Sequence, residues 1–459
     1  MEGKRQKNQV ELAFTAEKRG EAPKPVVQGT EPSAVKTETE SPASTEKLME
    51  EVCQRDNLLM ALKRVEANKG SPGIDGMTVN DLRGFLKKNW PTIREKLLSG
   101  AYEPKPVRRV EIPKPGGGVR KLGIPTVLDR LIQQAVLSVL QWRWDPTFSE
   151  NSYGFRPNRS QRQAVTKAQQ YIAEGYRWVV DLDLEKFFDR VNHDMLMGRV
   201  AKRIADKRLL RLIRAFLNAG TVMEDGLVSP TGEGTPQGGP LSPLLSNLML
   251  DDWDRELERR GLRFVRYADD CNVYVKSERA GKRVKASLTQ FLRAKLKLKV
   301  NEEKSAVARP EDRKFLGFSF TAEEVPRRRV APQTLERLKA RIRKLTRRSG
   351  GRSLAQVIAP LATYLIGWRN YFGFCETPSL LDRLDKWIRR RLRSLVWRQW
   401  QTGRKRFAEL VRRGVNRALA ARTAGSAHAH WRVSRSPALS YALPNALFSS
   451  LGLPTLASR

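Results

Sequence analysis

Residues 264–275 read FVRYADDCNVYV, in which two adjacent aspartates lie between runs of aromatic and β-branched residues. Such runs favour β-strands, and the short acidic segment between them predicts a tight hairpin turn. Adjacent carboxylates repel each other, so a hairpin that holds both at its tip is best explained by a divalent cation that offsets their charge. We therefore expect Asp269 and Asp270 to belong to a metal site. The simpler alternative is a solvated acidic turn, because short motifs have many false positives.

A second acidic strand is predicted upstream, at residues 178–183 with the sequence WVVDLD. Side chains alternate between the two faces of a strand, which places Asp181 and Asp183 on the same face. Either aspartate can join Asp269 and Asp270 at one site. The sequence therefore predicts three carboxylates that converge from two strands.

The composition indicates a globular protein with a polyanionic partner. The chain has 459 residues, 40% of them apolar, and 86 Lys and Arg against 49 Asp and Glu give a net charge of +37. Such self-repulsion is tolerated most easily when nucleic acid supplies the missing negative charge. No apolar run approaches the ~20 residues of a membrane-spanning helix, so no membrane partner is expected. The three cysteines and three histidines are scattered, which disfavours zinc and disulfides.

Composition also divides the chain into four segments. Residues 1–45 are polar and lack apolar periodicity, which predicts a flexible tail. Residues 46–325 alternate helical and strand patterns, as a mixed α/β core does. Residues 326–403 show three basic helical patterns with apolar seams. Residues 404–459 show no clear helix or strand pattern, and we expect a basic tail there that is a candidate DNA-binding region.

Two further segments suggest contacts with a nucleotide. Residues 105–122 read as a basic hairpin with a Pro-Gly-Gly-Gly turn. Residues 234–243, GTPQGGPLSP, form a Gly- and Pro-rich loop that leads into an apolar helix. Glycines allow the backbone to approach a ligand closely.

Six motifs occur in one order: YGFRP (153–157), DLEKFFD (183–189), PQG (236–238), YADD (267–270), NEEKS (301–305) and FLGF (315–318). This series resembles the reverse transcriptases encoded by bacterial group II introns, over roughly residues 46–400. The segment YLIGWRNYF (364–372) is similar to the maturase region of the same family. The resemblance implies an α+β right-hand polymerase, with fingers and an antiparallel palm sheet in residues 46–325. An α-helical thumb or maturase (X) domain would follow in residues 326–403.

The resemblance also implies roles for single residues. Asp183, Asp269 and Asp270 would be the catalytic carboxylates that hold two Mg²⁺ ions, with Mn²⁺ as a substitute. Asp183 is preferred over Asp181 because the family pattern places an aspartate five residues before the aromatic residue at Phe188. Phe188 would be a steric gate that rejects a 2′-hydroxyl, and its alternative is a core aromatic residue.

Four other residues would contact the nucleotide: Lys114, Arg120, Gln237 and Lys304. For Lys114 and Arg120 a solvated basic hairpin is the alternative, although both side chains suit the transferring phosphates. A primer grip would be formed by Phe315, Leu316, Gly317 and Phe318, for which a buried strand is the alternative. Arginines of the helical domain are candidates for RNA binding: Arg341, Arg343, Arg347, Arg389, Arg390 and Arg393.

The expected function is an RNA-directed DNA polymerase that copies intron RNA and also binds that RNA to assist splicing and mobility. Its partners would be group II intron RNA, a DNA target and primer, and dNTPs, in a nucleoid-associated ribonucleoprotein of the bacterial cytoplasm. After Gly403 there is no cysteine, so we expect no HNH endonuclease and a primer supplied from elsewhere.

Alternative functions are an RNA-binding splicing cofactor with an inactive polymerase site, and a host-adopted reverse transcriptase in defence or repair. An RNA-templated RNA polymerase is disfavoured by the bulk of Phe188.

Overall fold

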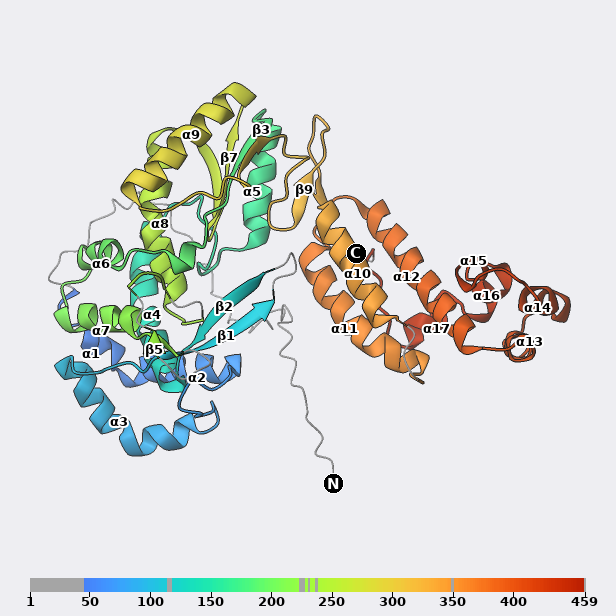
Figure 1. Ribbon diagram of the computed structural model, residues 1–459, viewed down its shortest axis with the longest axis horizontal. Coiled ribbons are helices and arrows are strands. Elements are labelled where there is room, and N and C mark those ends of the chain that lie inside the picture. The colour runs from blue at the N-terminus through green and yellow to red at the C-terminus, as the bar shows by residue number, and fades with distance from the viewer. Residues whose placement is uncertain are drawn as a thin grey trace, which may run out of the picture. The chain divides into compact units, whose positions relative to one another are not determined.

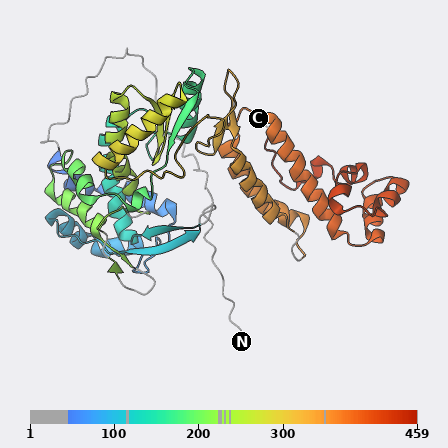
Figure 2. The ribbon, with the colours of Figure 1, turned by 45° about the horizontal axis from the view of Figure 1, so that its top comes forward.

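The computed structural model describes residues 45–113, 118–222, 228–229, 232–235, 238–347 and 351–457. They form two compact units, of which the first ends at Arg313 and the second begins at Lys314 (Figures 1 and 2). This division falls upstream of the boundary expected at residues 325 and 326. The flexible tail expected for residues 1–45 lies outside the described residues, except for Thr45.

The first unit combines helices with two antiparallel-rich sheets, as the α+β prediction requires. Its α-helices are α1 (Leu48–Val52), α2 (Arg55–Asn68), α3 (Leu82–Ser99), α4 (Val127–Trp144), α5 (Gln161–Ala173), α6 (His193–Ala201), α7 (Lys207–Asn218), α8 (Ser242–Arg259) and α9 (Glu278–Lys295). Two short 3-10 helices, η2 (Asp145–Thr147) and η3 (Phe187–Asp189), follow α4 and β3.

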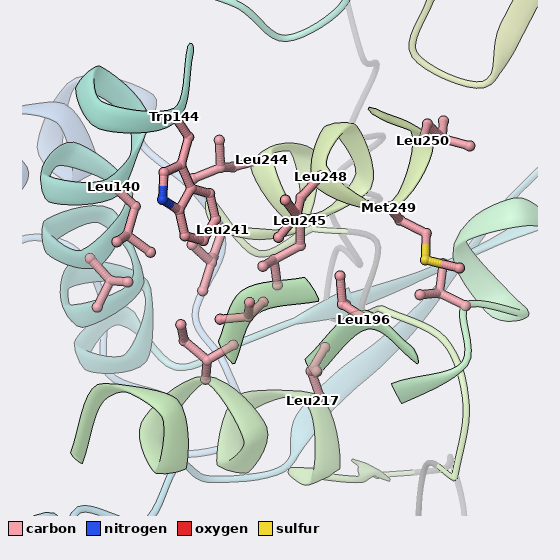
Figure 3. Packing of buried hydrophobic residues seen from close by; sticks show 14 of the residues in the cluster. Leu140, Trp144, Leu196, Leu217, Leu241, Leu244, Leu245, Leu248, Met249 and Leu250 are labelled. Atoms are coloured by element: carbon pink, nitrogen blue, oxygen red, sulfur yellow. The ribbon is translucent and has the colours of Figure 1, made fainter. Parts of the chain in front are cut away.

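Helix α8 lies at the centre of the core of this unit. Its first turns are apolar almost all round, and a helix of that kind is stable only when it is buried. Figure 3 shows leucines of α8, among them Leu244 and Leu248, beside Leu140 and Trp144 of α4 and Leu196 of α6. This packing fixes the helix that follows the Gly- and Pro-rich loop.

One four-stranded sheet carries both acidic segments. Its strands are β3 (Trp178–Leu182), β6 (Arg263–Tyr267), β7 (Asp270–Val275) and β8 (Ala306–Ala308), in the order β6-β7-β3-β8. All neighbouring pairs are antiparallel, so the sheet is the predicted antiparallel palm sheet. Its two central strands are the two that the sequence predicted to meet.

The basic hairpin forms the second sheet. Strands β1 (Val107–Pro113) and β2 (Val119–Ile124) pair antiparallel, which confirms the hairpin predicted for residues 105–122. Two short strands extend it: β4 (Thr221–Val222) pairs parallel with β1, and β5 (Val228–Ser229) pairs with β4.

In the described residues of the second unit most elements are helices, and β9 (Phe318–Phe320) and β10 (Arg328–Val330) form a small antiparallel pair. The three predicted basic helices are α10 (Pro332–Leu345), α11 (Leu354–Phe372) and α12 (Pro378–Gln399). Their apolar seams are buried, as at Ile342, Ile358 and Leu392. In the described residues no helix is both long and apolar enough to span a membrane.

The segment after Gly403 is folded, whereas the sequence patterns predicted no regular element in it. It contains α13 (Gly403–Arg412), α14 (Arg417–Ala424), α15 (His430–Val433), α16 (Pro437–Ala442) and α17 (Asn445–Ser450). Leu439, Leu443 and Phe448 are completely buried in the same core as α12. The helices have ten residues or fewer, so each presents too few apolar residues for a clear periodic pattern.

Candidate active site

The predicted acidic hairpin is present. Tyr267 pairs with Asp270 at the ends of β6 and β7, and Ala268 and Asp269 form the two-residue turn. Ala268 has a φ of 58°, and a positive φ at the first turn residue is a feature of type II′ hairpin turns. Asp269 is therefore held at the tip of the hairpin, and Asp270 begins the adjacent strand.

Asp183 lies beside this hairpin because of the register between β3 and β7. The last pair of that ladder is Leu182 with Cys271, so Asp183 and Asp270 each come one residue beyond it. The backbone of Asp183 is fixed from outside the sheet: its N–H donates to Ser305 Oγ at 2.9 Å, and its carbonyl accepts from the N–H of Asn301 at 2.8 Å.

The charge of Asp183 acts on the acidic hairpin. Burial raises the pKa of Asp269, and the carboxylate of Asp183 raises it further, whereas Arg120 and Arg266 oppose the shift. The Nζ of Lys304 lies 3.5 Å from Asp183 Oδ2. Among the residues that the structure describes, however, no group of three or more His, Cys, Asp or Glu is arranged to hold a metal ion. The three-carboxylate metal site stays a prediction.

Asp181, the alternative to Asp183, is engaged elsewhere. It is buried, and its Oδ2 accepts hydrogen bonds from Nε and Nη2 of Arg313 at 2.9 and 2.5 Å. The same guanidinium donates to the carbonyl of Lys304 at 2.6 Å. Asp181 therefore ties strand β3 to residues 304–313, and Asp183 is the more exposed of the two carboxylates.

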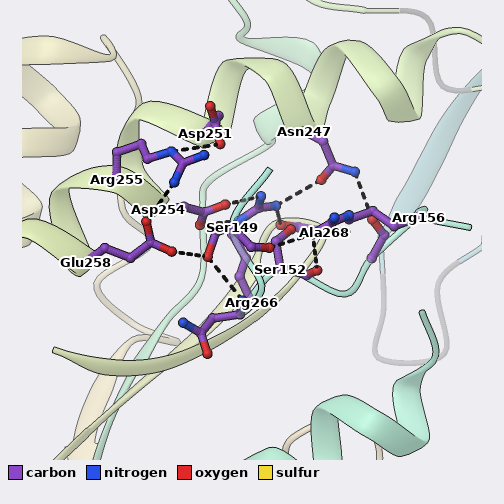
Figure 4. A network of polar contacts seen from close by, with 12 residues as sticks. Ser149, Ser152, Arg156, Asn247, Asp251, Asp254, Arg255, Glu258, Arg266 and Ala268 are labelled. Atoms are coloured by element: carbon purple, nitrogen blue, oxygen red, sulfur yellow. Dashed lines mark hydrogen bonds and ion pairs between the residues drawn. The ribbon is translucent and has the colours of Figure 1, made fainter. Parts of the chain in front are cut away.

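A buried polar network behind the hairpin was not predicted from the sequence (Figure 4). Arg266 of β6 is completely buried and donates to both carboxylate oxygens of Asp254, at 2.7 and 2.6 Å. Its Nη1 also donates to the carbonyl of Ala268 at 2.8 Å and to Asn247 Oδ1 at 3.1 Å. The turn that carries Asp269 is thus attached to helix α8. The available signal was Arg266 at a strand position flanked by Val265 and Tyr267.

The YGFRP segment supports the same turn. Asn247 Nδ2 donates to the carbonyl of Gly154 at 2.9 Å, and a β-carbon on Gly154 would collide with the backbone nitrogen of Ala268. Arg156 is itself buried and pairs with Asp145 at 2.8 Å. This motif therefore needs glycine for close approach and arginine for an internal ion pair.

Phe188 lies in η3, half-buried, with its ring edge-on to that of Phe187 at a centroid distance of 5.3 Å. Its carbonyl accepts a hydrogen bond of 2.6 Å from the N–H of Thr235. Gly234, at a φ of 91°, has no room for a β-carbon against the backbone of Phe188 and Asp189. The loop that leads to Pro236 and Gln237 therefore runs along η3.

The other predicted nucleotide contacts are only partly described. Arg120 lies on β2 opposite Ile112, is exposed, and acts electrostatically on Asp269. Lys304 is exposed beside Asp183. Lys114 and Gln237 lie outside the described residues.

The predicted primer grip is a two-residue turn in the second unit. Phe315 and Phe318 exchange two backbone hydrogen bonds of 2.9 Å, and both Leu316 and Gly317 have positive φ, as type I′ turns require. The hydroxyl of Tyr371 donates to the carbonyl of Leu316 at 3.1 Å. Helix α11 thereby holds the turn, and both phenylalanines are buried.

The arginines predicted to bind RNA fall into three groups. Arg390 and Arg393 donate to the backbone carbonyls of Trp431 and Leu443, so both hold the C-terminal helices. Arg341 and Arg343 lie over the rings of Tyr364 and Trp387. Arg347 is exposed and Arg389 is half-buried.

Two family models match the chain. Residues 112–320 match the reverse transcriptase (RNA-dependent DNA polymerase) family, and residues 335–414 match the maturase-specific domain of group II introns. The first match covers the palm sheet with all three aspartates, and the second begins within α10.

Curated relatives agree with these matches. Protein YkfC of Escherichia coli K12 is 33% identical over 324 residues, which are 62% of this chain and 84% of that protein. The group II intron-encoded protein LtrA of Lactococcus lactis subsp. cremoris is 30% identical over 331 residues, 58% of this chain and 55% of that protein. The putative COX1/OXI3 intron 1 protein of Saccharomyces cerevisiae is 26% identical over 397 residues, 74% of this chain and 47% of that protein.

This chain thus spans about half the length of those two intron proteins. A solved structure titled as a partial Cas6-RT-Cas1–Cas2 complex is 26% identical, with a TM-score of 0.35, over 54% of this chain and 42% of that chain. With a reverse transcriptase domain, a maturase-specific domain and these relatives, the chain belongs to the family of group II intron-encoded reverse transcriptases and maturases.

Proposed function

We propose that this protein extends the 3′-hydroxyl of a DNA primer with dNTPs on an RNA template, with Asp183, Asp269 and Asp270 as the catalytic carboxylates. We further propose that its helical unit binds group II intron RNA, that this binding assists splicing, and that the cDNA serves intron mobility. The observation that carries the first proposal is the ladder register, which brings Asp183 next to Asp270 at the end of the palm sheet that bears the Asp269 turn.

The carboxylates of Asp183, Asp269 and Asp270 have the ligand chemistry that a pair of Mg²⁺ ions requires, and we propose that they would hold these ions together with the substrate phosphates. Mg²⁺ prefers carboxylate oxygens and is usually held by one or two carboxylates together with substrate phosphates. Burial is the main cause of the raised pKa of Asp269, and the charge of Asp183 adds to it, so a cation at this position would favour the ionised form. Lys304, at 3.5 Å from Asp183, supplies a partial counter-charge. Bound Mg²⁺ would activate the primer hydroxyl and stabilise the leaving oxygen.

The remaining residues would orient the nucleotide. Arg120 has a planar guanidinium that can hold two phosphate oxygens at once, and its charge already acts on Asp269. Lys304 would exchange its contact with Asp183 for the departing pyrophosphate. Phe188 would lie under the sugar of the incoming nucleotide. Its carbonyl accepts a hydrogen bond from Thr235 and its ring contacts that of Phe187, so both its backbone and its side chain have fixed neighbours.

Intron RNA binding would rely on the helices that match the maturase-specific domain. Arg347 is exposed there, and Arg341 and Arg343 lie over aromatic rings, an arrangement that leaves guanidinium planes able to approach phosphates or bases. Arg390 and Arg393 have structural partners and contribute less to this proposal.

The decisive experiment is primer extension on an RNA template with Mg²⁺, comparing the wild type with Asp269→Asn and Asp56→Asn. The control residue Asp56 is exposed in the first turn of α2. We expect Asp269→Asn to abolish cDNA synthesis while RNA binding is retained, and Asp56→Asn to behave like the wild type. Comparable synthesis by Asp269→Asn would remove that carboxylate from the mechanism.

The same experiment separates the proposal from its main alternative. A wild type that binds intron RNA and promotes its splicing but makes no cDNA would be an RNA-binding splicing cofactor. Incorporation of rNTPs in place of dNTPs would contradict the role of Phe188.

A further inference from the structure

The second unit contains a cavity of about 250 Å³ between helices that are distant in the sequence. Its polar and aromatic lining comes from the end of α10, from α12 and from α15: Thr346, Arg391, Ser394, Arg398, His430 and Trp431. Pockets that enclose drug-sized ligands measure roughly 300–1,000 Å³. This cavity is therefore of a size for one phosphate group or one base rather than for a whole cofactor.

The charge around the cavity is positive. Burial lowers the pKa of Arg391, and the neighbouring Arg343 and Arg398 lower it further. Burial also lowers the pKa of His430, with Arg398 as the charge that adds to the effect. The charges that act on Arg391 and His430 are thus other arginines. Cations held together at the cost of mutual repulsion favour an anion among them.

The cationic and aromatic groups are fixed in place before any ligand arrives. Arg391 Nε donates to Thr346 Oγ1 at 3.0 Å, and its guanidinium lies 5.4 Å from the centre of the Trp387 ring. The guanidinium of Arg390 lies over the Trp431 ring at 3.9 Å and donates to the Trp431 carbonyl at 2.7 Å. Preorganised groups lose little conformational entropy on binding.

We propose that this cavity binds one phosphate of a single-stranded RNA segment, with an adjacent unstacked base against the stacked Arg390 and Trp431 side chains. Arg391, Arg398 and His430 supply hydrogen-bond donors for phosphate oxygens, and unpaired bases of RNA commonly stack on aromatic side chains. Single-stranded RNA is favoured over duplex because only an unpaired strand can present one phosphate and a splayed base to a cavity of this size. The inference rests on the proposed RNA binding of the helical unit and assigns it a specific site.

The location of the cavity gives the C-terminal helices a function. The maturase-specific match ends at residue 414, whereas His430 and Trp431 belong to α15 beyond it. Helix α15 is attached to α12 through Arg390. The segment after α13 therefore completes the site instead of acting as an unstructured basic tail.

The test measures binding of a labelled 12-nucleotide single-stranded RNA to the full chain, across a series of salt concentrations. The variants are Arg398→Gln and His430→Gln in the cavity, and Arg417→Gln as the charge-matched control. Arg398 and Arg417 are both exposed, and Arg417 lies on α14, away from the cavity lining. Thermal unfolding of each variant confirms that the fold is retained.

We expect Arg398→Gln to weaken RNA binding by about tenfold, as the loss of a hydrogen bond to a charged group predicts. The slope of log affinity against log salt should fall by about 0.7, the value for one phosphate of a single strand. His430→Gln should weaken binding less, and Arg417→Gln should change neither quantity.

Four results would overturn the inference. Equal effects of Arg398→Gln and Arg417→Gln would mean that only net charge matters. If Arg398→Gln weakened the binding of a single-stranded DNA of the same length but not that of the RNA, the cavity would be a DNA site and not an RNA site. A wild type that binds no RNA and makes no cDNA would refute the proposed function as well. Normal cDNA synthesis by the wild type, together with RNA binding that Arg398→Gln does not change, would refute the cavity site alone.

Discussion

The guanidinium of Arg266 and the carboxylate of Asp254 form a two-point ion pair that has no solvent exposure on either side. The pair lies directly behind the acidic hairpin, because Arg266 also donates to the carbonyl of Ala268 in the hairpin turn (Figure 4). Removal of one partner from a buried ion pair leaves the other charge without compensation. The position of Asp269 therefore depends on a residue of helix α8.

Asp254→Asn should lower the free energy of unfolding by about 3–5 kcal/mol, the cost of a broken buried pair. It should also lower the rate of primer extension, because the turn loses its attachment to α8. Urea unfolding and primer extension measure the two effects. Asp252→Asn is the matched control, since Asp252 lies on the same helix and pairs with Arg199 but is about half exposed. That change should cost less than about 1 kcal/mol, and equal costs for the two variants would refute the argument.

Asp251 should make the first unit less stable as the pH rises. Burial raises its pKa from 3.8 to about 6, although Arg255 and Arg203 oppose the shift. Between these values the folded chain holds a proton that the unfolded chain has lost, so stability falls as the pH increases through this window. Asp251→Asn has no proton to lose at this position. Between pH 4 and pH 7 the wild type should therefore lose stability relative to Asp251→Asn, as urea unfolding at both pH values measures. Parallel behaviour of the two proteins would place the pKa of Asp251 near its ordinary value.

Several elements could be predicted from the sequence because local patterns determine them. The alternation in β3, β6 and β7 and the turn between the last two were visible in residues 178–183 and 264–275. The apolar seams of α10, α11 and α12 have the 3.6-residue period, and a single period suffices to predict a helix. The meeting of Asp183 with the hairpin also followed, since both segments bear acids at the strand ends.

The supports of the site could not be predicted because they depend on contacts between distant segments. Nothing in the local sequence joins Arg266 to Asp254, or Asp181 to Arg313, 132 residues away. Asp385 likewise accepts hydrogen bonds from the backbone of Leu456 and Ala457. Such pairs become visible only once the fold brings the partners together.

Phe188 should determine the choice between dNTPs and rNTPs, whereas its neighbour Phe187 should affect only the stability of the fold. Phe188→Ala should increase incorporation of rNTPs relative to dNTPs, because a smaller side chain leaves space for a 2′-hydroxyl. Phe187 is buried in the core, so Phe187→Leu should lower the free energy of unfolding without changing sugar selectivity. Competition between dNTPs and rNTPs in primer extension measures selectivity. Unchanged selectivity in Phe188→Ala would assign Phe188 to the core as a packing residue only.

Gly317 should be more sensitive to substitution than its backbone angle alone predicts. Its φ of 85° disfavours any side chain, and a β-carbon there would lie 2.9 Å from the ring of Phe372, which leaves too little room. Gly351 separates the two effects, because its φ of 78° is similar and its β-carbon would meet nothing within 4 Å. Gly351→Ala should cost about 1–3 kcal/mol for backbone strain alone, whereas Gly317→Ala should cost more and also weaken primer extension through the displaced turn. Chemical unfolding of both variants gives the comparison, and equal losses would show that α11 does not constrain the turn.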